Sequence, residues 1–237
     1  MNLLKLTRDF ADEVDQLRFS PPVSAVYNPL HYAWEAHAQY LARTNAPVQV
    51  FFMGMNPGPW GMAQTGVPFG EVTRVQDWLG IKASVGKPPR EHPKRPVLGF
   101  DCTRSEVSGR RLWDFFRDVF ETSDRFFAGC TVHNFCPLVF MRESGANLTP
   151  DKLPAIEREP LETLCTEHLR RVIDLLSPQH LVGIGAYAET KLREACPERE
   201  VVRILHPSPA SPAANRDWAG TVKKQLDDSG VFPVADK

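Results

Sequence analysis

The sequence has 237 residues and a formal net charge of −1, with 42% hydrophobic and 24% charged residues, a balance typical of globular proteins. It has no apolar run of the roughly 18 residues that a membrane span needs, and its five cysteines form no CxxC pair, which argues against a zinc ribbon or a clustered iron–sulfur site. The near-neutral charge argues against a protein that coats DNA nonspecifically, but an enzyme that contacts a few phosphates around one nucleotide needs only local positive charge.

The N-terminus, MNLLKLTRDFADEVDQL, has early acidic residues and no uncharged core, so we expect no secretory signal. We expect a soluble intracellular protein, located in the cytoplasm with a bacterial nucleoid rather than in a nucleus. We also expect a monomer that needs no metal and no other cofactor and does not bind membranes.

Helical periodicity and short apolar runs alternate along the chain. In chain order they predict helices at 5–18 and 31–43, a strand at 47–55, a helix at 109–120, a strand at 126–137, a helix at 161–176, a strand at 179–185, a helix at 186–195, a strand at 201–205 and a helix at 212–228. Strands that alternate with helices of this length predict a parallel sheet covered on both faces. We therefore predict one α/β domain over 1–237, a three-layer α/β/α fold with a central, mainly parallel four-stranded sheet.

Unusual polar loops follow three of the predicted strands. They are GMNPGPWGMAQTGVPFGEV after the first strand, HNFCPL at the end of the second, and HPSPASPAAN after the fourth. In such sheets, ligands bind outside the carboxyl ends of the strands. We therefore expect the three loops to open onto the same edge of the sheet.

These loops resemble those of the single-strand-selective monofunctional uracil-DNA glycosylases, a family of the uracil-DNA glycosylase superfamily. The resemblance rests on GMNPGP running on to MAQTGVPFG, on HN followed by CPL, and on HPSP, in matching order and spacing over most of the chain. It implies the uracil-DNA glycosylase-like fold and a monofunctional enzyme that starts base excision repair. Such an enzyme hydrolyses the N-glycosidic bond of uracil, and of 5-hydroxymethyluracil and related damaged bases, in single- and double-stranded DNA.

Two residues are the catalytic candidates. The enzyme must flip the nucleotide into a pocket and stabilise a uracil that leaves with negative charge. The carbonyl of Asn56 can orient the attacking water, and a neutral N–H of His206 can stabilise uracil O2. By themselves, Asn56 could simply start a turn before Pro57 and His206 could simply close a strand; the surrounding motifs favour the functional interpretation.

Four residues are candidates for binding the base. One primary amide complements the O4 and N3–H of uracil, so we expect Asn134 to read the base, and strand alternation points the neighbouring His133 to the opposite side. Phe69 is expected to stack on the base, although it could also be an ordinary core residue. The resemblance implies that Gly58 leaves space at the uracil 5-position and that the backbone of Met55 contacts the base.

The resemblance also implies two DNA-facing segments. One is the loop that wedges into the duplex; its candidates are Ser208, Pro209, Ala210, Ser211, Pro212 and Asn215. The other lies in 144–158, with Asn147 and Thr149 as candidates. By composition alone, the first is a proline-rich turn and the second a solvated loop. The animal members carry a basic residue directly after HPSP, whereas this chain has alanine and serine there, so the strength of duplex penetration stays open.

The loops at 54–73 and 203–222 contain no lysine, and a glycosylase that also cleaves the strand needs an amine to form a Schiff base. This favours simple hydrolysis. Two other functions stay open. One is a non-catalytic DNA-damage or single-strand binding protein on the same fold. The other is a dinucleotide enzyme, because GIGAYA at 183–188 fits G-x-G-x-x-A, although no acidic residue ends the next strand.

Overall fold

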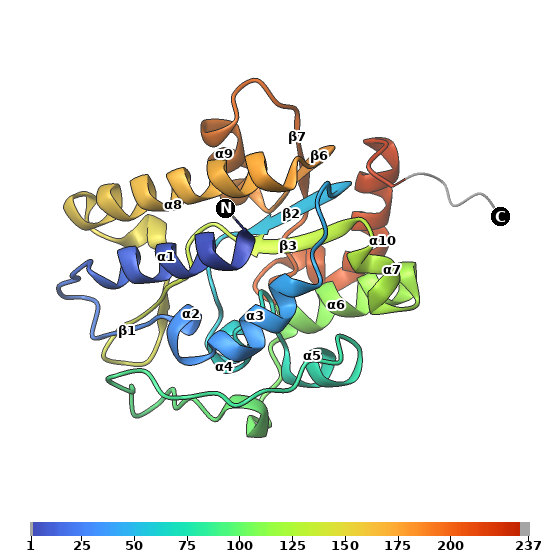
Figure 1. Ribbon diagram of the computed structural model, residues 1–237. Coiled ribbons are helices and arrows are strands. Elements are labelled where there is room, and N and C mark those ends of the chain that lie inside the picture. The colour runs from blue at the N-terminus through green and yellow to red at the C-terminus, as the bar shows by residue number, and fades with distance from the viewer. Residues whose placement is uncertain (1, 233–237) are drawn as a thin grey trace.

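The central sheet has four strands, all parallel, in the order β3-β2-β6-β7. This is the sheet that the sequence predicts, and Figure 1 shows it in the computed structural model, which describes residues 2–232 of the predicted domain. The strands are β2 (Val50–Gly54), β3 (Cys130–Asn134), β6 (His180–Ile184) and β7 (Val201–Ile204).

Helices cover both faces of this sheet (Figure 1). One layer consists of α8 (Ala155–Leu176) and α9 (Ala186–Ala195), with α1 (Leu3–Asp15) packed against α8. The other contains α6 (Val107–Phe120), α7 (Ser123–Phe127) and α10 (Pro212–Asp228). The three-layer α/β/α architecture is therefore confirmed. Among residues 2–232, no helix is both long and apolar enough to cross a membrane.

The central strand β2 is buried along its whole length. Phe52 packs on Phe116 of α6 with ring centroids 5.0 Å apart, whereas Phe51 stacks on His133 at 4.8 Å. Alternate residues of a strand face opposite layers, so both faces need apolar side chains, which explains the continuous apolar run in the sequence. Burial also lowers the pKa of His133 to about 3, so this imidazole is neutral and belongs to the interior.

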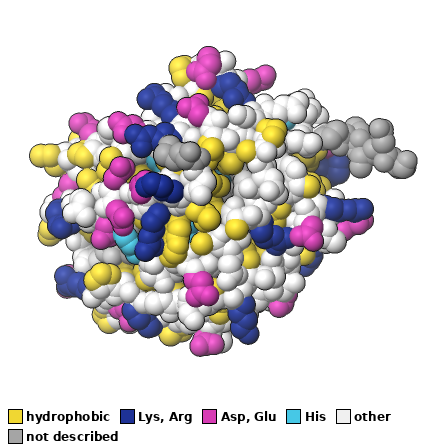
Figure 2. All heavy atoms as spheres, viewed as in Figure 1, with side chains coloured by type: hydrophobic (Ala, Val, Ile, Leu, Met, Phe, Trp, Pro, Cys, Tyr) yellow, Lys and Arg dark blue, Asp and Glu magenta, His cyan; other side chains and the backbone are white. Residues whose placement is uncertain are grey.

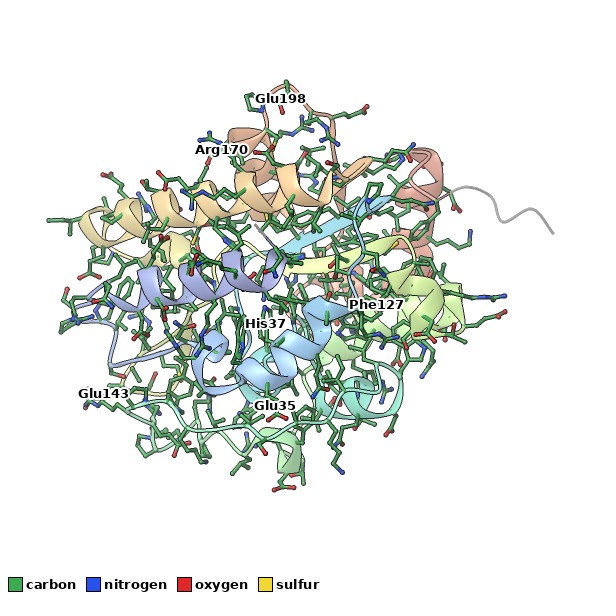
Figure 3. The ribbon with its side chains drawn as sticks, in the orientation of Figure 1. Glu35, His37, Phe127, Glu143, Arg170 and Glu198 are labelled. Carbon is green, nitrogen blue, oxygen red and sulfur yellow. The ribbon has the colours of Figure 1, made fainter. Side chains whose placement is uncertain are left out.

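The edge strand β3 is closed by a side chain instead of another strand. The Tyr40 hydroxyl, from α3 (Trp34–Ala42), donates to the carbonyl of Val132 and accepts from its N–H, both at 2.9 Å. A free strand edge leaves such backbone groups unpaired, and one buried phenol satisfies two of them. On the same helix His37, labelled in Figure 3, is buried, and its Nδ1 lies 2.7 Å from the carbonyl oxygen of Gly66.

A second, antiparallel sheet was not predicted. It has the order β1-β4-β5, with β1 (Ala25–Tyr27), β4 (Val139–Met141) and β5 (Asn147–Leu148). Strands of two or three residues are too short to show a period of two in a sequence. This sheet matters for the site, because β4 and β5 place the segments around residues 138 and 147–149 beside the main sheet.

Several predicted boundaries are wrong. The strand predicted at 126–137 begins only at Cys130, because Thr122 caps α7 by accepting from the N–H of Arg125 at 3.3 Å and draws the preceding apolar residues into a helix. The helix predicted at 31–43 is divided at Ala33 into α2 (Pro29–Tyr32) and α3, and the one predicted at 161–176 begins earlier, at Ala155. The remaining helices are α4 (Met62–Thr65) and α5 (Val72–Asp77), with short 3-10 turns at Gly99–Asp101 and Pro150–Lys152.

The surface mixes charges of both signs. On the face seen in Figure 2, Lys and Arg side chains alternate with Asp and Glu, without a large patch of one sign. This agrees with the net charge of −1. Any attraction for a polyanion on this face would have to be local.

Candidate active site

A pocket of about 630 Å³ opens where the loops after β2, β3 and β7 meet. The three polar loops thus share one edge of the sheet, as the sequence predicts. Ten of the predicted site residues line it: Met55, Asn56, Gly58, Phe69, Asn134, Asn147, Thr149, His206, Ser208 and Pro209. Seven other residues complete its wall: Pro57, Pro59, Trp60, Ser105, Glu106, Val107 and Ser108.

Asn56 has its amide nitrogen fixed by the protein. Nδ2 donates to the carbonyl of Leu138 at 3.2 Å and is 3.5 Å from that of Pro57. Leu138 lies between β3 and β4, so the small antiparallel sheet helps to hold the amide. With Nδ2 turned to Leu138, the side-chain carbonyl becomes the polar atom that can accept from a water in the pocket.

His206 has one ring nitrogen capped by backbone. The N–H of Ser208 donates to Nδ1 at 3.1 Å, so Nδ1 carries no proton and the neutral ring carries its proton on Nε2. Burial lowers the pKa of His206, which keeps the ring neutral at physiological pH. The result is a neutral N–H donor at the pocket, the form that a developing oxyanion requires.

Asn134 and Phe69 meet over the end of β2. A Cβ placed on Gly54 would lie 2.5 Å from the Phe69 ring and 2.8 Å from Oδ1 of Asn134, so only glycine lets both side chains approach there. Nδ2 of Asn134 donates to the thioether of Met62 at 3.2 Å, and its buried Oδ1 has no hydrogen-bond partner within the described chain. The Met55 carbonyl accepts from the N–H of Cys136 at 2.9 Å, which ties the loop after β2 to the loop after β3.

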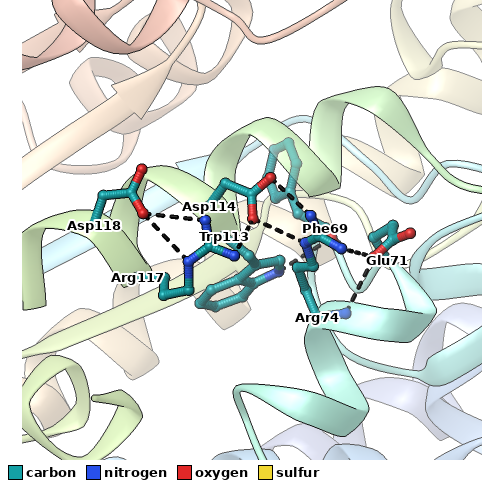
Figure 4. Close-up of polar contacts among 7 residues, drawn as sticks. All are labelled: Phe69, Glu71, Arg74, Trp113, Asp114, Arg117 and Asp118. Atoms are coloured by element: carbon teal, nitrogen blue, oxygen red, sulfur yellow. Dashed lines mark hydrogen bonds and ion pairs between the residues drawn. The ribbon is translucent and has the colours of Figure 1, made fainter. Parts of the chain in front are cut away.

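The backbone of Phe69 has a left-handed conformation, with φ of 53°, which is uncommon for a bulky residue. Figure 4 shows what maintains it. The Trp113 indole N–H donates to the Phe69 carbonyl at 3.1 Å, and the N–H of Glu71 donates to the same oxygen at 2.8 Å. Arg74 of α5 forms a two-point ion pair with Asp114 of α6, at 2.9 and 3.0 Å. This pair joins α5, which follows Phe69, to α6, which carries Trp113.

Glu106 is a site residue that sequence reasoning missed. Its carboxylate lies where a side chain at residue 58 would stand: a Cβ on Gly58 would be 2.0 Å from Oε2, and one on Gly61 would be 2.7 Å from the carboxyl carbon. Oε2 is buried and unpartnered within residues 2–232. Burial raises the pKa of Glu106 to about 7, against the opposing effect of hydrogen bonds from the backbone of Trp60 and Gly61. Glu106 therefore limits residue 58 to glycine, independently of any contact between Gly58 and a substrate.

The other four predicted DNA contacts lie outside the pocket lining. Ser211 caps α10 by accepting from the N–H of Ala214 at 3.3 Å, and Pro212 is the first residue of that helix. Asn215 has both ends of its amide bonded, to the Pro209 carbonyl at 2.8 Å and to Arg111 at 2.9 Å. Ala210 is exposed in the turn between these residues.

The glycines of GIGAYA have a structural explanation. Helix α9 lies so close to β6 that a Cβ on Gly183 would be 2.5 Å from the backbone nitrogen of Glu189. Close helix–strand packing therefore accounts for the pattern without a dinucleotide. Among the described residues, no group of three or more His, Cys, Asp or Glu side chains is placed to hold a metal ion.

Comparisons with known proteins place most of the chain in one family. The family model of the uracil DNA glycosylase superfamily matches residues 41–226. The chain is 51% identical over 228 residues to the single-strand selective monofunctional uracil DNA glycosylase of Bos taurus, covering 94% of this chain and 84% of that one. The Rattus norvegicus protein of the same name is 52% identical over 227 residues, covering 94% and 82%. In fold, the chain is similar to the crystal structure of wild-type Pedobacter heparinus SMUG2, with a TM-score of 0.69, 16% identity and coverage of 97% of each chain.

Proposed function

The chain belongs to the single-strand selective monofunctional uracil-DNA glycosylases of the uracil DNA glycosylase superfamily, and we propose from this premise that it hydrolyses the N-glycosidic bond of uracil in DNA and so starts base excision repair. The observation that carries the proposal is the gathering of Asn56, Asn134, His206 and Phe69 around one pocket. Asn56, Asn134 and His206 follow three different strands, and Phe69 lies between α4 and α5, so their meeting is a property of the fold.

The flipped base is bound by Phe69 and Asn134. The ring of Phe69 stacks on the base, a contact worth about 1–3 kcal/mol. The amide of Asn134 donates from Nδ2 to O4 and accepts at Oδ1 from N3–H. Cytosine offers the reverse pattern of donors and acceptors, so it leaves the amide unsatisfied, and a buried unsatisfied group costs about 1–3 kcal/mol.

The bond breaks between the sugar carbon and N1 of uracil. The bonding electrons leave with the base, and the sugar gains oxocarbenium character, as in glycoside hydrolysis. The Asn56 carbonyl orients a water towards that carbon, which then bonds to the water oxygen. An amide has no basicity to take up the proton, so Asn56 acts by positioning. The attacking water releases its proton to the solvent, and the uracil anion takes up a proton from the solvent.

His206 stabilises the departing uracil anion. Its Nε2–H faces the charge that develops on O2 and donates a hydrogen bond without transferring the proton. Loss of one such donor costs about 10²–10³ in rate in other enzymes. Because Nδ1 accepts from the Ser208 backbone, the donor is held in place before the base arrives.

Hydrolysis leaves an abasic site in an intact strand. The residues lining the pocket include no lysine, and a strand-cleaving glycosylase needs an amine nucleophile. We extend the proposal to 5-hydroxymethyluracil and related damaged bases, to both single- and double-stranded DNA, and to a monomeric enzyme.

The proposal is tested by release of the base itself. Oligonucleotides with one uracil, single-stranded and paired, are incubated with the protein; free uracil is measured by mass spectrometry, and strand cleavage is measured before and after mild alkali. We expect free uracil, with cleavage only after alkali, and neither from a thymine control. Binding without release from either strand form would instead indicate a non-catalytic damage-binding protein. A panel with 5-hydroxymethyluracil, hypoxanthine and xanthine then defines the substrate range.

A further inference from the structure

Arg111 of α6 is joined to the loop that carries His206. Its guanidinium donates from one terminal nitrogen to the carbonyl of Pro207 at 3.1 Å, with that of Ser208 at 3.5 Å. The other terminal nitrogen donates to Oδ1 of Asn215 at 2.9 Å. The guanidinium thus spans the loop from its start to the first turn of α10.

The same loop residues determine which nitrogen of His206 carries the proton. Ser208, whose carbonyl lies at Arg111, donates its own N–H to Nδ1 of His206 at 3.1 Å. Asn215 in turn donates to the Pro209 carbonyl at 2.8 Å. The contacts therefore form a continuous path from the guanidinium through the Pro207–Pro209 backbone to the imidazole.

The chemistry of Arg111 suits this task. All of these acceptors are uncharged amide oxygens, and a planar guanidinium can serve several of them in fixed directions, which a lysine ammonium cannot do equally well. The side chain is half-buried, whereas the neighbouring Arg110 on the same helix is exposed. The N–H groups of Ser208 and Ser211 already donate within the loop. Because prolines supply no N–H, the Pro207 carbonyl instead accepts from Arg111.

We propose that Arg111 is a positioning residue: it holds the 206–215 loop in the conformation in which Ser208 caps Nδ1 of His206 and the Nε2–H faces the pocket. This inference rests on the proposed role of His206 in uracil release. Arg111 itself does not touch the base. Its removal leaves the Pro207 carbonyl without its donor, whereas the Ser208 carbonyl keeps the N–H of Ser211 at 3.0 Å. The start of the loop is then free to shift, and the imidazole loses its fixed orientation and proton position.

The test compares Arg111→Met and Arg111→Lys with the matched control Arg110→Met. At saturating enzyme, we expect both Arg111 variants to lose at least about tenfold in single-turnover rate, because a misplacement of about 1 Å can cost about 100-fold. Their Kd for single-stranded DNA containing an abasic analogue should change less than about threefold. The control should match the wild type in both measurements.

The proton position on His206 is a readout that a general loss of stability would not give. In protein labelled with ¹⁵N-histidine, with the signals assigned by His206→Ala, the wild type should show a protonated Nε2 and an unprotonated Nδ1. In folded Arg111→Met this pattern should give way to a mixture of tautomers. If Arg111→Met does not fold, the same tautomer measurement is made on Arg111→Lys.

Two results would overturn the inference. The first is a wild-type tautomer pattern in the folded variant. The second is a wild-type rate at saturating enzyme combined with weaker, less salt-dependent DNA binding, which would make Arg111 a phosphate contact. If the wild type itself releases no uracil, the proposed function fails, whereas the tautomer measurement still decides the role of Arg111.

Discussion

Replacing Glu106 by glutamine should remove a pH-dependent penalty on stability. Burial raises the pKa of this carboxyl from its ordinary 4.5 to about 7. Between these two pH values the unfolded chain has released the proton while the folded chain still holds it, so the free energy of unfolding falls as pH rises. Each pKa unit is worth about 1.4 kcal/mol, so Glu106 costs the folded protein about 3 kcal/mol by the time the pH passes 7.

The measurement is urea denaturation at pH 5 and pH 8 for the wild type, Glu106→Gln and a control, Glu143→Gln, whose side chain is exposed (labelled in Figure 3). Between the two pH values, Glu106→Gln should lose about 2–3 kcal/mol less stability than the wild type, and the control should match the wild type. Because only the change in the free energy of unfolding between the two pH values is compared, any pH-independent effect of the substitution on stability cancels. If the wild type and Glu106→Gln lose equal stability over this range, the carboxyl is not desolvated in the way the structure indicates.

Three further predictions concern the reaction. Asn56→Ala and His206→Ala should each lower the single-turnover rate of uracil release by about 10²–10³ with unchanged circular dichroism, and near-wild-type rates would remove them from the catalytic residues. Asn134→Asp should slow uracil release, because a carboxylate cannot donate to O4; an unchanged rate would mean that the base is read elsewhere. Gly58→Ala should lower activity because its Cβ would meet the Glu106 carboxylate, and Glu106→Ala in the same chain should restore part of it; failure of this rescue in a folded double variant would assign the defect to substrate fit instead.

The sequence predicted the main sheet because each central strand is buried on both faces. Phe51 and Phe52 face opposite layers, so the apolar run has no polar alternation and could be recognised directly. Helices α9 and α10 also have the predicted bounds, since a glycine turn precedes one and a serine cap with a following proline begins the other. The antiparallel sheet could not be predicted, because its strands are too short to carry a pattern.

The site was predicted to the extent that it lies in loops directly after strands. Asn56, Asn134 and His206 are found at the carboxyl ends of β2, β3 and β7, where a parallel sheet brings such loops together. Glu106 and Arg111 could not be found in this way, because their partners are distant in the chain and meet them only in the fold. The glycines at 58 and 61 signal a close approach, but not the identity of the approaching group.

The left-handed backbone at Phe69 bears on the entropy cost of binding a flipped nucleotide. Trp113 and Glu71 hold the Phe69 carbonyl, and the ring itself is buried against Gly54. The ring is therefore ordered once the chain folds, before a nucleotide is extruded. A flipped base would therefore stack on an aromatic ring that is already ordered, so binding would not cost the conformational entropy of ordering that side chain. Weakening the Trp113 contact should therefore reduce affinity through disorder in the free protein, while the complex itself looks unchanged.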